Sequence, residues 1–181
     1  LLSWLYPRAL ADSRLCPVDP PSSLNDAQAR NLFAPSLIAK RTGAFTRAGA
    51  TQDLYLVSLG ECGASSADHY GTHLLYVLED GKVVLQEAAQ VIVLGATVDA
   101  DLDGTLDVIT TTGTTAMGEL YEFATLVSLA GGQLSTLREF GQVLHSTCAS
   151  GAPDGEDVST IWVTPGATPS FRVERQQRSC E

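Results

Sequence analysis

Several features that mark familiar functional classes are missing from this sequence. It has no run of about eighteen or more apolar residues, so it predicts no membrane-spanning helix. Basic residues are few, with 11 Lys and Arg against 21 Asp and Glu, and the net charge is −10 at pH 7. A chain this acidic, without a basic cluster, is not expected to bind nucleic acid.

The motifs of common enzyme classes are also missing. The sequence has no Gly-x-Ser-x-Gly elbow, glycine-rich phosphate loop, His-Glu-x-x-His helix or haem-attachment Cys-x-x-Cys-His. His69 and His73 have the spacing of a zinc pair, but Gly63 and Gly71 indicate a loop, where unsupported histidines are usually solvated. These absences favour a protein that is not an enzyme.

Cysteine is scarce but even in number. Four cysteines, at 16, 62, 148 and 180, are widely spaced and form no Cys-x-x-Cys pair. That pattern favours two disulfides in an oxidising compartment over a zinc or redox site, with buried thiols in a cytosolic protein as the alternative. Four cysteines allow three pairings, and their spacing does not choose among them. We expect a secreted protein, extracellular or periplasmic.

The most informative segment present is an aspartate-rich loop. Carboxylates alternate with other residues around Gly104, whose flexible backbone suits a sharp turn. Ca²⁺ binds six to eight oxygen ligands, and four crowded carboxylates repel one another unless a cation neutralises them. The predicted ligands are the side chains of the aspartates together with the backbone carbonyl of the threonine: Asp99, Asp101, Asp103, Thr105 and Asp107.

A helix-loop-helix calcium site would carry a bidentate Glu at its twelfth position, which here is Thr110. Residues 106–113 are instead rich in β-branched side chains, which favour a strand. Segment 98–109 resembles the calcium loop of FG-GAP and related VCBS-type bacterial surface repeats. That resemblance covers about a dozen residues. It implies bound Ca²⁺ in a β-propeller blade and nothing about catalysis.

Beyond the loop, the pattern is mainly that of β-strands. Proline- and serine-rich residues precede a predicted short helix over 24–33, which Pro35 limits. We expect an N-terminal extension over 1–50 and a β-repeat domain over 51–181. Hairpin turns are expected at 79–81 and 130–132. Strands are predicted over 53–59, 73–78, 82–87, 90–97, 107–112, 120–129, 133–139, 158–164 and 170–174.

An internal period of 52 residues is also visible. Residues 85–92 align with 137–144, and the same offset relates Leu54 to Leu106 and then to Val158. We therefore predict about three blade-like antiparallel repeats, with a β-sandwich or a trefoil-like barrel as alternatives. Three blades cannot close a propeller, so other parts of the chain or a second copy would have to cover the open edges.

Three functional hypotheses follow. The first is a secreted, calcium-stabilised β-repeat module that binds a protein, a glycan or copies of itself in an extracellular assembly. The second is an extracellular hydrolase or accessory domain with a structural calcium site, which a separate pair of carboxylates in a cleft would favour. The third is a structural subunit of a fibre or envelope complex.

Overall fold

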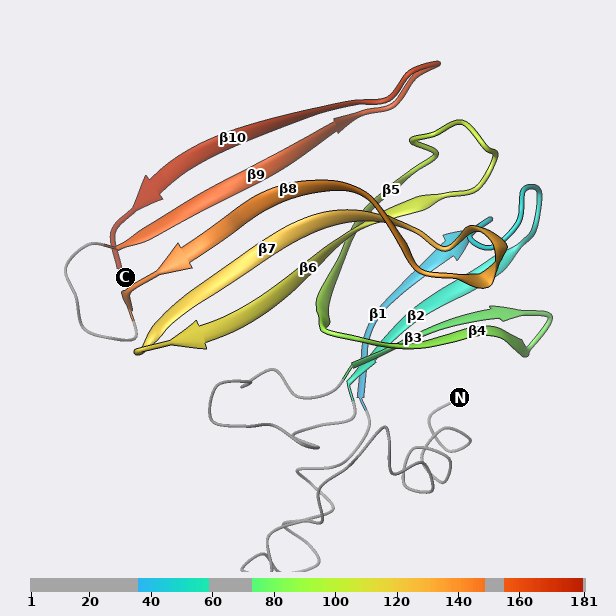
Figure 1. Ribbon diagram of the computed structural model, residues 1–181, viewed down its shortest axis with the longest axis horizontal. Coiled ribbons are helices and arrows are strands. Elements are labelled where there is room, and N and C mark those ends of the chain that lie inside the picture. The colour runs from blue at the N-terminus through green and yellow to red at the C-terminus, as the bar shows by residue number, and fades with distance from the viewer. Residues whose placement is uncertain (1–35, 59–72, 149–154, 181) are drawn as a thin grey trace, which may run out of the picture.

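The computed structural model describes residues 36–58, 73–148 and 155–180. In these residues it contains ten strands and one 3-10 turn (Figure 1). Most strands lie where the alternating or β-branched sequence segments predicted them. Their bounds are β1 Ser36–Gly43, β2 Gln52–Ser58, β3 His73–Glu79, β4 Lys82–Ala89, β5 Val91–Val98, β6 Asp107–Ala116, β7 Glu119–Ser128, η1 Ala130–Gly132, β8 Ser135–Ser146, β9 Glu156–Thr164 and β10 Ser170–Arg178.

The strands form two antiparallel sheets. One has the order β1-β2-β3-β4, and the other has the order β10-β9-β8-β7-β6-β5. Within each sheet every strand pairs with its neighbours in the sequence, which is the arrangement that short hairpin connections produce. The prediction of a mainly β fold is therefore confirmed. Figure 1 shows that the six-stranded sheet curves strongly.

Both predicted hairpin turns are present. Asp80 and Gly81 have φ angles of 50° and 74° and join β3 to β4, as expected for a two-residue turn that requires left-handed backbone. Gly131 and Gly132, with φ angles of 68° and 76°, lie in the connection between β7 and β8. Glycine adopts this conformation without the steric cost that a side chain would add.

The main hydrophobic core lies between the two sheets. In strand β2, buried Leu54 and Leu56 lie on one face and belong to this core, and the residue between them, Tyr55, is less buried. The core joins residues of β2–β4 and the β1–β2 loop to residues of β5–β7: Phe45, Leu54, Leu56, Leu75, Val77, Leu85, Val91, Leu94, Val108, Val127 and Leu129.

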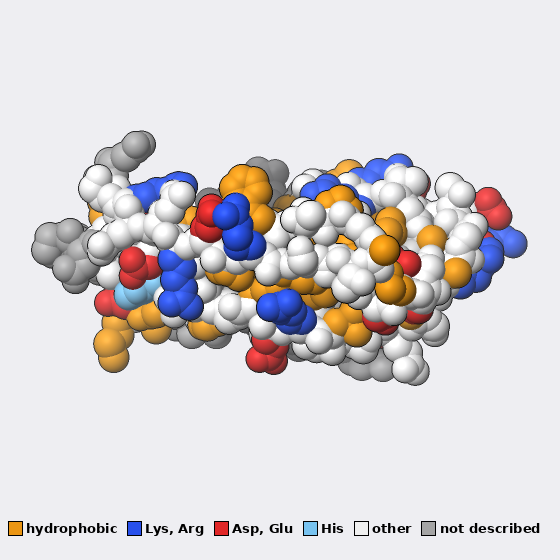
Figure 2. All heavy atoms as spheres, turned by 90° about the horizontal axis from the view of Figure 1, so that it is seen from above, with side chains coloured by type: hydrophobic (Ala, Val, Ile, Leu, Met, Phe, Trp, Pro, Cys, Tyr) orange, Lys and Arg blue, Asp and Glu red, His pale blue; other side chains and the backbone are white. Residues whose placement is uncertain are grey.

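A second, smaller cluster involves only the six-stranded sheet and its β5–β6 loop. Buried Ile109 and Leu126 belong to it, and partly buried Phe140, Ile161 and Phe171 pack against it. Seen from above, the molecule is elongated, and apolar side chains are exposed along the middle of that face (Figure 2).

One predicted disulfide pairing is now assigned. Cys148, just after β8, bonds to Cys180, just after β10, with their Cα atoms 5.4 Å apart. The bond ties the end of the chain to β8 across β9, and β8 itself pairs with β9 at only three positions. Cys16 and Cys62 lie outside the described residues, as does the predicted helix over 24–33.

The structure differs from the expected organisation in two respects. Residues 36–43, which we assigned to the N-terminal extension, form β1 and pair with β2, so the boundary at residue 50 falls between two paired strands. The three-blade repeat is not confirmed, because residues 137–144 lie within one strand, whereas 85–92 span the end of β4 and the start of β5. Two packed sheets are closer to the sandwich alternative.

Among the described residues, no helix is long and apolar enough to cross a membrane.

Candidate metal centre

The aspartate loop connects β5 to β6 and lies where the two sheets meet. Figure 1 places this connection at the same end of the molecule as the β1–β2 and β7–β8 connections. The Leu106 amide donates a hydrogen bond to the Ala44 carbonyl, and the Gly131 amide donates to the Thr46 carbonyl at 2.8 Å. The β1–β2 loop therefore bridges the candidate metal loop and the β7–β8 connection.

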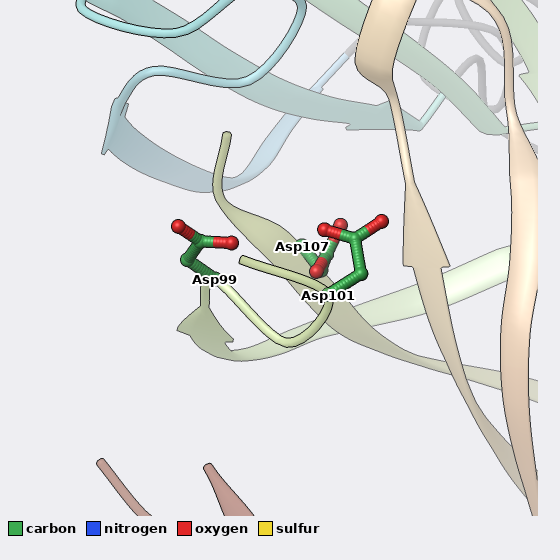
Figure 3. A group of neighbouring side chains, drawn as sticks. All are labelled: Asp99, Asp101 and Asp107. Atoms are coloured by element: carbon green, nitrogen blue, oxygen red, sulfur yellow. The ribbon is translucent and has the colours of Figure 1, made fainter. Parts of the chain in front are cut away.

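Three of the predicted ligands converge. Asp99 and Asp101 come from the loop and Asp107 from the first position of β6 (Figure 3). Each offers a carboxylate oxygen, and these oxygens lie within 4.8 Å of one another. Two oxygens that each lie 2.3–2.6 Å from one Ca²⁺ can be about 5 Å apart at most, so this spacing fits a shared cation.

Asp107 is the buried member of the group. Its side chain has no solvent exposure, and its Oδ2 accepts a hydrogen bond from the Ala100 amide at 2.9 Å. Its Oδ1, like the Oδ1 of Asp99, is buried without a hydrogen-bond donor in bonding geometry. A buried carboxylate oxygen with no donor is costly, and a cation is one way to satisfy it.

The electrostatics of Asp107 reflect that burial. Desolvation raises the pKa of this carboxyl above its ordinary value, and the charges of Asp101 and Asp103 raise it further. The hydrogen bond from the Ala100 amide and the nearby Ser128 hydroxyl act in the opposite direction but do not cancel the effect of burial. A negative charge at Asp107 is therefore less favourable than at an exposed aspartate.

Asp103 does not join this group of converging carboxylates. Asp103 Oδ1 accepts hydrogen bonds from the Thr105 amide at 2.7 Å and from the Thr105 hydroxyl at 2.6 Å. These bonds hold the pKa of Asp103 below its usual range, with the hydroxyl making the larger contribution. In the structure as it stands, Asp103 orders the turn by bonding to the backbone two residues on, as aspartates do in tight turns.

The backbone of the loop is unusual in two places. Leu102 and Gly104 have φ angles of 64° and 85°. A Cβ at Gly104 would lie 2.9 Å from the Ala48 Cβ, so the loop needs glycine there for its conformation and also for its close approach to the β1–β2 loop. The sequence predicted the turn at Gly104, and the structure adds the neighbour that makes it tight.

Sequence reasoning missed the residue that supports this arrangement from the other side. Gln52 is buried, and its Oε1 accepts hydrogen bonds from the amides of Phe45 and Thr46, each at 2.9 Å. Its Nε2 donates to Thr46 Oγ1 at 2.7 Å and to Glu79 Oε2 at 2.8 Å. No pattern in the sequence singles out this glutamine, because its partners come from two separate segments, the β1–β2 loop and the end of β3.

The other polar groups that we considered do not form a comparable site. His73 is not solvated as expected but is buried at the start of β3, and His69 lies outside the described residues. Glu119 accepts hydrogen bonds from Tyr121 and from His145, whose rings are stacked 4.7 Å apart. This cluster lies on β7 and β8 near the ends of those strands that are remote from the aspartate loop.

Comparisons with protein-family models, with curated proteins and with solved structures found no significant match for this chain.

Proposed function

We propose that this chain is a calcium-stabilised β module of the extracellular or periplasmic space, in which the ion supports association with a protein, a glycan or a second copy. The converging carboxylates of Asp99, Asp101 and Asp107 bind the cation. The other two ligands predicted from the sequence, the Asp103 side chain and the Thr105 carbonyl, bind it as well. The resemblance of segment 98–109 to FG-GAP calcium loops supports the same assignment.

The observation that carries the proposal is the pair of buried, donor-free carboxylate oxygens on Asp99 and Asp107. Both belong to the group whose oxygens lie within 4.8 Å of one another. Ca²⁺ prefers oxygen ligands such as these carboxylates, whereas zinc sites are typically built from nitrogen and sulfur ligands.

The mechanism is rigidification. A divalent cation neutralises the repulsion among the aspartates and makes the burial of a charged Asp107 favourable. Because the loop touches the β1–β2 connection through Leu106 and Gly104, an ordered loop also fixes one sheet against the other. The disulfide between Cys148 and Cys180 supports the oxidising compartment that a secreted module would occupy.

Thermal unfolding with calcium or with EDTA tests this proposal. Binding adds RT ln(1 + [L]/Kd) to stability, which is about 2.7 kcal/mol at a hundredfold excess of ligand over Kd. For a chain of this size that corresponds to a rise in Tm of roughly 5–10 °C. Asp107→Asn should abolish the rise because it removes the buried negative charge that faces the ion.

Asp80→Asn is the matched control, since Asp80 is an exposed acid in the β3–β4 turn and asparagine tolerates its positive φ. It should show the same calcium-dependent rise as the wild type. Equal melting temperatures of the wild type in EDTA and in millimolar calcium would contradict the proposal. So would an equal response of the wild type and Asp107→Asn.

The alternative, a hydrolase with a structural calcium site, calls for paired carboxylates in a separate cleft. Two cavities among the described residues lie along the β9–β10 hairpin, with volumes of about 670 Å³ and 360 Å³. Among the described residues that line them, the first cavity has one carboxylate, Glu156, and the second has one, Asp157. Neither therefore supplies the feature that would favour this alternative.

A further inference from the structure

Strand β10 is an outer strand of the six-stranded sheet, and its charged side chains are the main feature that protects this edge. It pairs with β9 at nine consecutive positions without a bulge, and no described strand lies on its other side. Residues 170–178 contain no proline. Natural proteins usually shorten, bend or cover such an edge, because its free backbone groups can pair with another strand.

The side chains of β10 divide between the two faces of the sheet. Arg172 and Glu174 share the face of Trp162, since Glu174 accepts hydrogen bonds from the Trp162 indole at 2.8 Å and from Arg172 at 2.9 Å. Phe171 lies on the opposite face, where its ring contacts Phe140 at 5.4 Å between centroids. By the alternation of a strand, Val173 and Arg175 lie on the face of Phe171.

We propose that β10 pairs antiparallel with β10 of a second copy, about a two-fold axis at Val173. This register places Val173 opposite itself, Arg172 opposite Glu174 twice, and Phe171 opposite Arg175 twice. Opposite charges and Arg–aromatic pairs that face each other directly across strands are stabilising. The segment 170–176 is therefore complementary to its own reversed sequence.

Neighbouring registers lack this property. A two-fold axis perpendicular to the sheet places the same face of both copies on the same side. Residues that pair across the two strands must therefore come from the same face of β10. Moving the axis by one residue, from Val173 to Arg172 or to Glu174, places two like charges directly opposite each other. Moving it by two residues to Arg175 does the same, whereas moving it by two residues to Phe171 places Arg172 opposite Ser170 and so removes the opposite-charge pairs. Like charges facing each other in this way are destabilising.

Apolar side chains are also exposed on both faces of the β9–β10 hairpin. Trp162 is 50% exposed and Val173 is 39% exposed, and Figure 2 shows apolar side chains in the open with charged side chains among them. In the dimer the two six-stranded sheets join into one continuous sheet, and the calcium loops are not part of the interface. The dimer thus specifies the self-association in the proposed function without depending on the metal.

A charge-reversal pair tests both the dimer and its register. The wild-type chain should sediment as a dimer of twice 19.1 kDa at high concentration. In a dimer of the Arg172→Glu variant, residue 172 of each copy is a glutamate that faces Glu174 of the other copy. In a dimer of the Glu174→Arg variant, residue 174 of each copy is an arginine that faces Arg172 of the other copy. Each variant alone should weaken self-association by about tenfold to a hundredfold. An equimolar mixture restores every opposite-charge pair and should form a heterodimer.

Lys82→Glu makes the same charge change as Arg172→Glu at an exposed position of β4, and this control should remain dimeric. Circular dichroism of each variant confirms that it is folded. The proposal is overturned if the wild type stays monomeric at about millimolar concentration, if Arg172→Glu leaves the dimer intact, or if the mixture fails to associate. A monomer whose Tm still rises with calcium would overturn this dimer and leave the calcium proposal standing.

Discussion

At the scale of single residues, the function proposed here depends most on Asp107. Several acids of the loop are exposed and could serve simply as a solvated turn. Asp107 differs because it has no exposure and keeps one carboxylate oxygen without a donor. An aspartate that is buried without a donor lowers the stability of the folded protein, and a bound cation would offset that loss.

Glu79 provides a prediction about pH. Its pKa lies below the ordinary 4.5, because the Gln52 amide and then the Arg47 guanidinium bind its carboxylate. A carboxyl with a lowered pKa stabilises the folded state above its unfolded pKa, and this contribution is lost as the pH falls through the folded pKa. We therefore expect Glu79→Gln to reduce stability near neutral pH and to flatten the loss of stability below about pH 4.5.

Urea unfolding of both proteins between about pH 7 and pH 3 measures this difference. Glu87→Gln, on neighbouring β4, is the control and should leave the shape of the curve unchanged. If Glu79→Gln and the wild type lose stability in parallel on acidification, Glu79 does not have the role assigned to it.

At the scale of elements, the β1–β2 loop and the β5–β6 loop act as one unit. Gln52 holds the first loop through two backbone amides, and the Ala44 carbonyl then accepts a hydrogen bond from Leu106 of the second. Buried hydrogen bonds of this kind are costly to leave unmade. Changes in the β1–β2 loop should therefore alter calcium affinity at the proposed metal site.

Gly104→Ala tests this coupling. A side chain there adds the strain of a positive φ, roughly 1–2 kcal/mol, and a contact of 2.9 Å with the Ala48 Cβ. Gly49→Ala is the matched control, because Gly49 has a φ of 72° but open space around it. We expect Gly104→Ala to lose more stability in urea unfolding than Gly49→Ala, and to bind calcium more weakly by titration calorimetry.

The double variant Gly104→Ala with Ala48→Gly removes the contact but keeps the strain. It should recover stability to about the level of Gly49→Ala, after correction for Ala48→Gly alone. Equal losses of stability in Gly104→Ala and Gly49→Ala would show that the close contact between the two loops has no effect on stability.

At the scale of the whole molecule, the chain is two sheets joined by a core and closed at its C-terminal end by a disulfide. Cys148 and Cys180 are separated by 32 residues, and the bond constrains the unfolded chain over that span. In the chain-entropy account a loop of this length is worth about 3–4 kcal/mol. The contribution matters because the β8–β9 junction that it spans has few paired positions.

Replacing both cysteines by alanine should therefore lower the free energy of unfolding by about 3–4 kcal/mol in urea unfolding. Because the bond lies far from the aspartate loop along the sheet, the rise in Tm on adding calcium should persist. A double variant as stable as the wild type would show that strand pairing alone holds the C-terminal hairpin.

Much of the strand pattern was predictable because it depends on local chemistry. Alternating apolar residues, β-branched runs and turn dipeptides such as Asp80-Gly81 act over a few residues. Strand β1 was missed since its sequence groups the apolar residues 37–39 and then the polar residues 40–42 instead of alternating them, although burial does alternate along 38–43 in the structure. It becomes a strand through pairing with β2, which is a tertiary effect. The 52-residue period was misleading because similar β-rich segments need not occupy equivalent places.

By itself, the sequence determined the β class, the acidic loop around Gly104 and the presence of paired cysteines, since these follow from composition and local spacing. Only the tertiary structure decided which aspartates converge, that Asp107 is buried, and that Cys148 pairs with Cys180. It also showed that Gln52 supports the loop from another strand. The reason is physical. Whether a carboxylate is buried, lies near other carboxylates or lacks a hydrogen-bond donor depends on segments that are distant in the chain and meet only after the sheets pack.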